Sequence, residues 1–413
     1  MSKERVEKKI NDFTLSIETG EVAKQANGAV VVAMGETQIL VTACAASKPR
    51  PDAGFFPLTV EYRPRTYAAG RIPGGFFKRE GRPRGEDVLT ARLTDRPIRP
   101  RFPKDFMNET QIWCMPVSFD VENDPDVLGL LGASAALTIS DIPFDGPIGA
   151  IRVGYVGDDF VANPTLSQRE ASVIDLIIAG TGKDIIMVEG SANEVSEDFL
   201  VEALEFAKPH LAELCDLQNE LAKRVGKTKF EYEPVGVPSD ELDRTIREKV
   251  GDRITDLTTI PEKMKRKKAM DDLFESIIEE LDEEFEDLKA ESSKVFSEIE
   301  RETMRRMILQ DKKRIDGRGP GDIRPITIVP SYLRRTHGSA LFTRGETQAL
   351  AVLTLGTKMD EQKIEDLEGE SFKSFLLHYN FPPFSVGEVR RATGPGRREI
   401  GHGALAELSL IHI

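Results

Sequence analysis

Two adjacent arginines and a histidine lie in a glycine-rich stretch, Gly394-Pro-Gly-Arg-Arg-Glu-Ile-Gly-His-Gly403. The guanidinium groups of Arg397 and Arg398 can form paired hydrogen bonds with phosphate oxygens, and the imidazole of His402 follows four residues later. Glycines let an anion approach the backbone, and a helix beginning here would favour negative charge at its N-terminus. The stretch therefore predicts a phosphate-binding site, although surface arginines beside a structural turn would give the same pattern.

A second segment combines aromatic and basic side chains in the loop Gly74-Gly-Phe-Phe-Lys-Arg79. Phe76 and Phe77 could stack on bases while Lys78 and Arg79 meet phosphates, which is how proteins bind single-stranded nucleic acid without sequence preference. The alternative is that one of the phenylalanines belongs to the core, since consecutive residues of a strand face opposite sides. We expect an RNA-binding surface here. The arginines that follow and are assigned to the same surface are Arg92, Arg96 and Arg99.

Two other patterns are weak as functional sites. Gly180-Thr-Gly-Lys183 resembles part of a nucleotide-binding loop, but Asp184 replaces the Ser or Thr that would bind magnesium, and the upstream glycine is missing. A turn between strands is the better interpretation. The three cysteines, Cys44, Cys114 and Cys215, have no C-x-x-C spacing, so neither a zinc site nor a disulfide framework is expected.

The composition favours a soluble, cytoplasmic protein of two or three domains. The 413 residues contain 31% charged and 39% hydrophobic side chains, with no apolar run long enough to span a membrane and no signal peptide. The net charge of −14 argues against nucleic acid as a partner, but the charge is unevenly distributed. Residues 61–101 hold eleven Lys or Arg and five acids, enough for a local phosphate-binding surface. Residues 271–300 hold thirteen acids and two lysines, which we interpret as a solvated helix face, with an acidic docking surface as the alternative.

The chain contains an internal repeat. GAVVVAMGETQILVTACA at 28–45 and GSALFTRGETQALAVLTL at 338–355 match at six of eighteen positions. Each copy has two apolar runs around a Gly-Glu turn, which is the pattern of a β-hairpin. The chain therefore begins two copies of one domain.

The segments around the repeat predict an α/β first domain followed by an all-helical region. After the first hairpin we expect a helix within 126–142, strands at 148–156, 173–179 and 185–189, and a helix after Ser196 that Pro209 kinks or restarts. Residues 239–313 are expected to be helical, including an amphipathic helix whose apolar stripe runs from Leu273 through Phe285 to Leu288.

Taken in order, several segments make the chain similar to the bacterial polynucleotide phosphorylase family. They are GETQILVTA (35–43), the Phe-Phe-Lys-Arg loop, LTARLTDRPIRPRF (89–102), GASAALTISDIPFDGPIGA (132–150), RIDGR (314–318) and GRREIGHGALAE (396–407). The resemblance implies an α/β (α+β) protein with two ribonuclease PH-like domains, of the ribosomal protein S5 domain 2-like fold, joined by an all-helical domain. It implies the bounds 1–226 for the first domain, 227–313 for the helical domain and 314–413 for an incomplete second domain.

The resemblance also implies an activity. The family degrades RNA by phosphorolysis, in which inorganic phosphate attacks the 3′-terminal phosphodiester and releases a nucleoside diphosphate, reversibly, in a homotrimeric ring. Single-stranded RNA and inorganic phosphate are therefore the expected partners, and Mg²⁺ is the expected cofactor. By resemblance, Arg397, Arg398 and His402 bind phosphate and the RNA end, whereas the family's serine turn, two aspartates and lysine fall beyond residue 413. The chain alone is therefore expected to be an inactive fragment with no metal site.

The first domain is not expected to replace those groups. Where the family has its serine turn the chain has Glu122-Asn-Asp-Pro-Asp126, whose negative charges would repel phosphate, and where the family has Asp-Phe-Lys the chain has Asp175-Leu-Ile177. We therefore expect this domain to guide RNA without catalysing. Two alternatives stay open: a non-catalytic RNA-binding ring subunit, and a globular scaffold whose arginine-rich loop binds acidic proteins.

Overall fold

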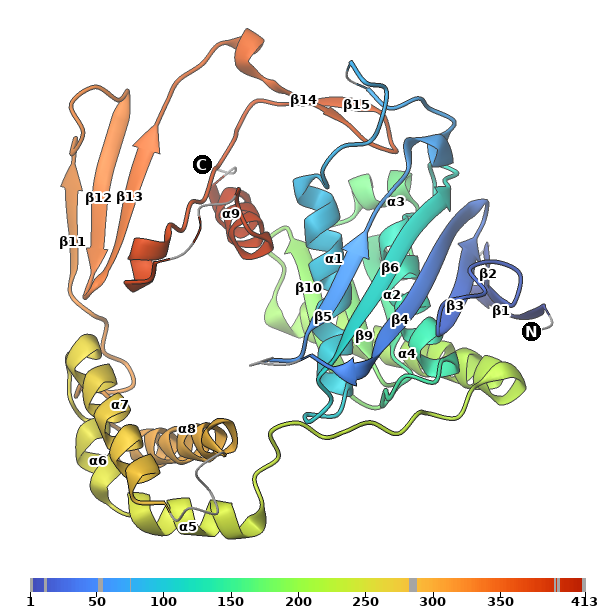
Figure 1. The fold of residues 1–413 in the computed structure, drawn as a ribbon. Helices are drawn as coiled ribbons and strands as arrows, with labels where there is room; N and C mark the ends of the chain where they lie inside the picture. The colour runs from blue at the N-terminus through green and yellow to red at the C-terminus, as the bar shows by residue number, and fades with distance from the viewer. Residues whose placement is uncertain are drawn as a thin grey trace. The chain divides into compact units, whose positions relative to one another are not determined.

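The computed structural model describes residues 3–10, 13–50, 55–74, 76–281, 288–389, 391 and 394–410 (Figure 1). The chain divides into two compact units. The first comprises Met1–Glu233 together with Asp360–Ile413, and the second comprises Pro234–Met359. The first unit therefore contains the first copy of the repeat and the segment that follows the second hairpin.

A six-stranded sheet forms the larger part of the first unit. Its strands lie in the order β1-β2-β3-β4-β6-β5, antiparallel except for the parallel pair β5 and β6. The hairpin predicted at 28–45 is confirmed as β3 and β4, which are joined at Gly35, whose φ of +59° suits glycine. The strands are β1 (Glu4–Ile10), β2 (Phe13–Thr19), β3 (Gly28–Met34), β4 (Thr37–Pro49), β5 (Leu58–Tyr62) and β6 (Asn108–Ser118).

The buried helix α2 (Pro125–Ile139) covers β3, β4 and β6, as the small and apolar residues of 126–142 predict. Asp124 caps the helix by accepting a hydrogen bond from the Asp126 N–H at 3.1 Å. The helix lies so close to the sheet that a Cβ on Gly28 would be 2.0 Å from the carbonyl oxygen of Ala136. Glycine at this position is therefore required by packing.

The second sheet of this unit has the order β10-β9-β7-β8 and packs against the long helix α4 (Glu197–Val225). Ser196 caps α4 as predicted, but the expected restart at Pro209 is wrong, because the helix runs through that residue. Tertiary packing of one apolar face, which includes the fully buried Ala207 and Leu211, holds the helix on both sides of the proline. The three strands predicted from the sequence are confirmed. The elements are β7 (Gly149–Val156), β8 (Asp159–Ala162), α3 (Leu166–Ala171), β9 (Ile174–Gly180) and β10 (Ile185–Ala192).

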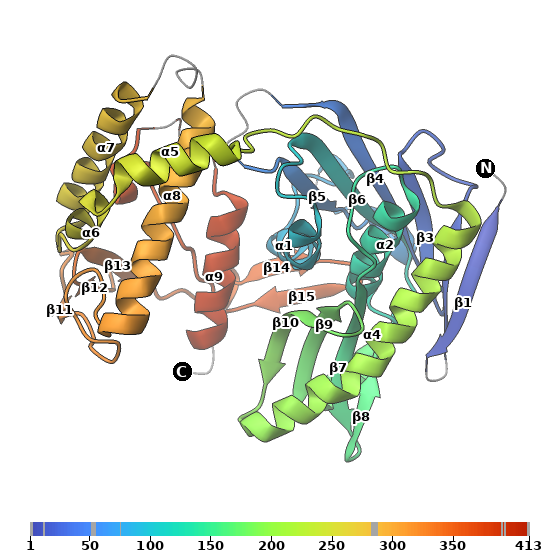
Figure 2. The ribbon, with the colours of Figure 1, turned by 90° about the horizontal axis from the view of Figure 1, so that it is seen from below.

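The segment from residue 360 onward packs against the first copy. Its helix α9 (Arg397–Leu410) contacts α1 (Gly85–Ile98), and the two helices lie side by side in both ribbon views (Figures 1 and 2). The hairpin of β14 (Gln362–Glu365) and β15 (Glu370–Lys373) places Leu367 in a small apolar cluster with Ala68 and Phe119. Residues from both copies of the repeat thus build one unit.

The second unit contains four α-helices among its described residues. They are α5 (Asp240–Val250), α6 (Arg253–Thr258), α7 (Lys263–Glu279) and α8 (Lys289–Arg306), followed by a π-helical turn at Met307–Asp311. The predicted helical region is confirmed, but the single helix expected from 273 to 288 is wrong. Helix α7 ends before Glu280 and α8 begins after Leu288, while Phe285 lies outside the described residues. The apolar pattern is shared by the two helices because both face one core, which includes Ile277 and Val295.

The second hairpin of the repeat is also confirmed, as part of a three-stranded antiparallel sheet. Its strands are β11 (Ile326–Pro330), β12 (Gly338–Arg344) and β13 (Thr347–Leu353). The turn at Gly345 has a φ of +60°, matching Gly35 of the first copy. The apolar side chains of this three-stranded sheet are largely exposed, including Ile328 at 61% and Val352 at 51%.

Candidate phosphate and nucleic-acid interface

Arg397 opens helix α9 and is held by two acceptors of strand β5. Its Nη1 donates to the carbonyl oxygen of Val60 at 2.5 Å, and its Nη2 forms an ion pair with Oε1 of Glu61. The other carboxylate oxygen of Glu61 accepts hydrogen bonds from Arg63 at 2.9 and 3.0 Å, and Arg63 lies over the ring of Trp113. The guanidinium group is therefore fixed on the first copy of the repeat.

The two other residues of the predicted phosphate site are placed on the same helix. Arg398 is exposed and has no polar partner among the described residues. His402 is half-buried and contacts Tyr379 edge-to-face, with the ring centroids 5.3 Å apart. Because Arg398 and His402 are four residues apart on a helix, their side chains share one face. The side chains of Arg398 and His402 are therefore available to a ligand, whereas that of Arg397 is anchored.

Arg92 joins the two sites that the sequence predicts separately. Its Nη1 donates to the backbone carbonyl of Arg397 at 3.2 Å. A Cβ on Gly401 would lie 2.9 Å from the Arg92 guanidinium carbon, so the glycine lets this side chain lie against α9. A positive charge of the first copy is therefore adjacent to the start of α9.

The other two arginines assigned to the RNA surface have internal partners. Arg96 pairs with Glu189 at 2.6 Å and donates to the carbonyl oxygen of Val188 at 2.9 Å. Arg99 forms a two-point ion pair with Asp95 at 2.7 and 2.8 Å. It also donates to two backbone carbonyls and lies over the Phe56 ring. These contacts brace α1, and the RNA role of both arginines stays a prediction.

The loop of Phe76 and Phe77 extends into solvent. The two side chains are 93% and 87% exposed and contact each other edge-to-face. This exposure excludes the alternative that they belong to the core. Arg71 and Arg84 lie at the two ends of the loop and donate to backbone carbonyls of the β14–β15 hairpin, at 3.1 to 3.3 Å. The loop is therefore anchored at its base and free at its tip.

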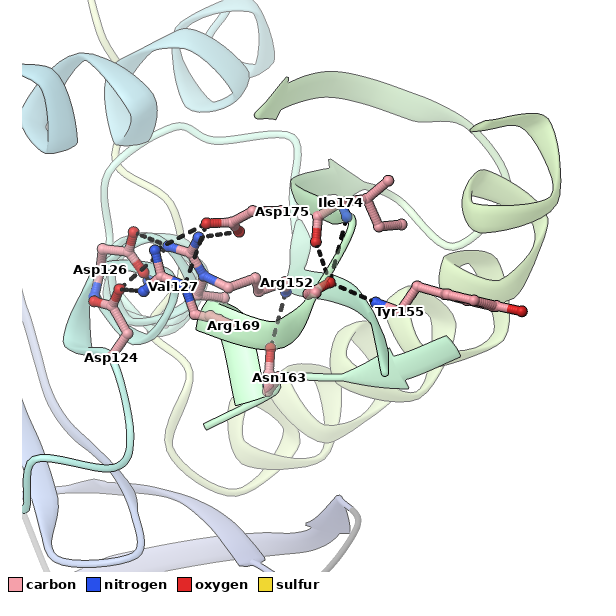
Figure 3. Close-up of polar contacts among 10 residues, drawn as sticks. Asp124, Asp126, Val127, Arg152, Tyr155, Asn163, Arg169, Ile174 and Asp175 are labelled. Carbon is pink, nitrogen blue, oxygen red and sulfur yellow. Dashed lines mark hydrogen bonds and ion pairs between the residues drawn. The ribbon is translucent and has the colours of Figure 1, made fainter. Parts of the chain in front are cut away.

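Sequence reasoning missed a network of ion pairs at the N-terminus of α2 (Figure 3). Arg152 of β7 donates to Asp126 at 2.5 Å and to Asp124 at 3.2 Å, and it also pairs with Asp175. Arg169 of α3 pairs with Asp124 at 2.6 Å and with Asp175 at 2.9 Å. The sequence analysis expects Asp124 and Asp126 to repel phosphate, but nothing in the sequence pattern indicates their arginine partners.

This network closes the region around the N-terminus of α2, which corresponds by resemblance to the family's serine turn. Carboxylates already occupy both guanidinium groups, and the adjoining cavity, lined in part by Met34 and Asn163, is only about 10 Å³. That volume holds about one water molecule. Burial raises the pKa of Asp126 even though Arg152 acts to lower it, whereas for Asp175 the two arginines outweigh burial and lower the pKa. The region is a structural ion-pair cluster.

The described residues do not form a fitting metal site. Among the described residues, no group of three His, Cys, Asp or Glu side chains is arranged to hold a metal ion. The three aspartates of the ion-pair network are paired with Arg152 and Arg169, so their oxygens are engaged and the negative charge available to Mg²⁺ is largely offset. None of the helices in the described part of the chain has the length and apolar character needed to cross a bilayer.

Three family models match the chain. The model described as the 3′ exoribonuclease family, domain 1, matches residues 14–143 and again 322–413. The model of domain 2 of that family matches 146–209, and the model of the polyribonucleotide nucleotidyltransferase RNA binding domain matches 241–319. The double match of domain 1, with a helical region between its two parts, confirms the predicted fold class. The exact domain bounds stay a prediction.

Curated relatives match over nearly the whole chain. A polyribonucleotide nucleotidyltransferase of Roseiflexus sp. (strain RS-1) is 49% identical over 97% of this chain and 54% of its own length. The same enzyme of Geotalea uraniireducens is 49% identical over 99% of this chain and 59% of its own. The enzyme of Desulfosudis oleivorans is 48% identical over 100% of this chain and 57% of its own length. The chain therefore spans little more than half the length of these relatives.

Proposed function

Because the chain belongs to the 3′ exoribonuclease family, and within it to the polyribonucleotide nucleotidyltransferases, we propose that the whole protein degrades RNA by phosphorolysis from the 3′ end. An oxygen of inorganic phosphate would attack the phosphorus of the terminal linkage. The bond from that phosphorus to the 3′ oxygen of the preceding ribose would break, and that oxygen would take a proton. The products are a nucleoside diphosphate and an RNA shortened by one residue, and the reverse reaction extends RNA.

The observation that carries this proposal is the cationic cluster at the start of α9. Arg398, Arg397 and the adjacent Arg92 present three guanidinium groups at a helix N-terminus, which favours an anion. In the proposal, Arg397 and Arg398 bind the phosphate and the RNA end, and they stabilise charge that develops on the reacting phosphoryl group. His402, on the face of Arg398, is positioned to donate a hydrogen bond to the same groups.

We propose that the RNA strand reaches this cluster over the loop of residues 76–79. The exposed rings of Phe76 and Phe77 would stack on bases, and Lys78 and Arg79 would contact phosphates. Arg96 and Arg99 would contribute less than the loop residues, because each is paired with a carboxylate that occupies its donors and offsets its charge. The first copy would guide RNA without catalysing, which agrees with its closed ion-pair network.

The remaining features of the proposal come from the family resemblance. We propose inorganic phosphate as the second substrate, a homotrimer as the assembly and the cytoplasm as the location. We propose Mg²⁺ as the cofactor, and by resemblance its ligands are the two aspartates expected beyond residue 413. The described residues offer no fitting site. When bound, such an ion would neutralise charge on the reacting phosphate. None of the roles proposed for Arg397, Arg398 and His402 depends on the ion.

The test uses the full-length protein with a single-stranded RNA substrate. Release of nucleoside diphosphate should require inorganic phosphate, and Arg398→Gln should lower kcat/KM by about 10²-fold or more because a charge-stabilising donor is removed. Arg5→Gln, a surface change on β1, is the matched control and should act like the wild type. Hydrolysis to nucleoside monophosphate, or no release of nucleotide, would contradict the proposed function. Wild-type activity in Arg398→Gln would contradict the site alone.

A further inference from the structure

We propose that Glu61, a residue of the first copy, positions the guanidinium group of Arg397 for phosphate. The inference deepens the proposed function and rests on it. Glu61 does not itself reach a substrate in this proposal. It is a positioning residue, so the copy that lacks catalytic groups still determines how the phosphate site of the other copy is oriented.

The contacts of Arg397 leave part of its binding capacity unused. An arginine side chain has five N–H donors in a planar fork. Arg397 uses one at Nη1 for the carbonyl of Val60 and one at Nη2 for the carboxylate of Glu61. Nε and the remaining hydrogens of both Nη atoms stay available for a phosphate, which suits a two-point contact. The two protein acceptors thus fix the plane of the fork without filling it.

Both acceptors belong to β5, the edge strand of the six-stranded sheet, which is held in place by its pairing with β6. Val60 and Glu61 are consecutive residues of β5 and pair with Ile112 and Trp113 of β6. The side chain of Val60 is fully buried, and that of Glu61 is 14% exposed. Sites supported by regular secondary structure hold their side chains more closely than loops do. An arginine held here therefore has little orientational freedom left to lose when phosphate binds.

Glu61 is itself held by a second arginine. Arg63 occupies the carboxylate oxygen that Arg397 does not use, and it lies with its guanidinium carbon 5.7 Å from the centre of the Trp113 ring. The three charged groups of Arg63, Glu61 and Arg397 sum to +1. The carboxylate therefore orients Arg397 while the cluster stays attractive to an anion.

A competing interpretation is that Glu61 occupies the place of the phosphate and must be displaced. In that case removing the carboxylate would free Arg397 and lower the KM for phosphate. A positioning role predicts the opposite, because an unheld arginine would lose side-chain entropy on binding. The buried and braced geometry of Glu61 favours positioning, and the direction of the KM change separates the two interpretations.

The experiment measures phosphorolysis by the full-length protein with varied inorganic phosphate. Glu61→Ala should raise the KM for phosphate about tenfold, because a binding group is no longer oriented. Glu61→Gln retains an acceptor oxygen at the same place and should restore most of the affinity. RNA affinity measured without phosphate should change much less than the phosphate KM in both variants, because Arg397 would contact only the RNA end while the exposed loop of residues 76–79 is untouched. A merely structural role would not separate the phosphate KM from RNA affinity in this way.

Glu18→Ala is the matched control, because Glu18 is also a strand glutamate, 20% exposed, with a lysine partner at 2.9 Å. It should leave the phosphate KM unchanged. A Glu61→Ala protein with an unchanged or lowered KM would overturn the inference while the proposed function stands. If Glu61→Ala fails to fold, Arg63→Met tests the same point by releasing Glu61 from its brace, and a wild-type KM there would overturn the inference. Absence of phosphorolysis in the wild type would overturn both.

Discussion

The hydroxyl of Thr37 donates a hydrogen bond of 2.9 Å to the carboxylate of Asp120, joining the β3–β4 turn to the segment that leads into α2. The same carboxylate accepts hydrogen bonds from the backbone N–H groups of Glu36 and Thr37, and from Glu122 and Asn123 on its own segment. Burial would raise the pKa of Asp120, but these hydrogen bonds outweigh it and lower the pKa to about 2. The ionised form therefore stabilises the fold.

The first prediction concerns acid stability. Because the pKa of Asp120 is lower in the folded than in the unfolded chain, its contribution is complete above about pH 4 and is lost as the pH falls through about 2. The contribution is about 1 to 2 kcal/mol after allowance for solvent screening. Urea unfolding between pH 2 and 7 should show this loss in the wild type and a flatter profile in Asp120→Asn. Asp158→Asn, an exposed change at a left-handed turn position, is the control. Parallel profiles of unfolding free energy against pH for the wild type and Asp120→Asn would contradict the prediction.

The second prediction concerns the ion-pair network of the first copy. Arg152→Met removes the guanidinium group that contacts three aspartates and leaves Asp126 buried beside Asp124 without its main partner. The free energy of unfolding should fall by about 3 to 5 kcal/mol, as for other broken buried ion pairs. Denaturant unfolding of the full chain, monitored in the first unit, measures this loss of free energy. Arg224→Met, whose partner Glu220 is on the helix surface, should cost less than about 1 kcal/mol. A similar small cost for Arg152→Met would show that the network is dispensable.

The sequence predicted elements where local pattern and tertiary packing agree. The Gly-Glu turns at 35–36 and 345–346 identify both hairpins, and the small residues of α2 indicate a closely packed helix. The pattern failed between 273 and 288, since two separate helices that face one core can share a single apolar pattern in the sequence.

The site was predictable in its residue types but not in its partners. Arg397 and Glu61 are 336 residues apart, and no local pattern relates them. Arg152 lies within an otherwise apolar strand, where a sequence pattern does not indicate which carboxylates approach it. Long-range ion pairs depend on how the elements pack, and for that reason they become visible only in the folded chain.

The third prediction concerns RNA binding by the exposed loop. Phe77→Ala should weaken single-stranded RNA binding by about 1 to 3 kcal/mol, the value of one stacked base, without changing the salt dependence. Lys78→Ala should instead lower the salt slope by about one unit, because the protein would neutralise one phosphate fewer. Fluorescence anisotropy at several salt concentrations measures both. Phe55→Ala is the control, because Phe55 is also an exposed phenylalanine, at 75%. Wild-type binding in both loop variants would refute the RNA assignment.

The fourth prediction concerns the docking of residues 360–410 on the first copy. Leu367 is 8% exposed and packs against Ala68 and Phe119, so Leu367→Ala should cost about 2 kcal/mol of docking free energy. Amide hydrogen exchange should accelerate in β14, β15 and α9 but not in the six-stranded sheet. Leu355→Ala, at a side chain that is 70% exposed, should change neither the docking free energy nor the rates of hydrogen exchange. Uniform acceleration across the first unit would mean that the hairpin and the sheet unfold together.

The contacts of Arg397 and Arg71 also set an order of events during synthesis. Arg71 and Glu368 are 297 residues apart, and every residue of the helical unit must be made before these contacts can close. Domains fold as units from the N-terminus on the ribosome, and contacts between distant residues form slowly. The sheet of the first copy, with its exposed aromatic loop, therefore exists before α9 has been translated. If the loop binds RNA as proposed, a nascent chain would be able to hold RNA before it acquires the arginines that we propose bind phosphate.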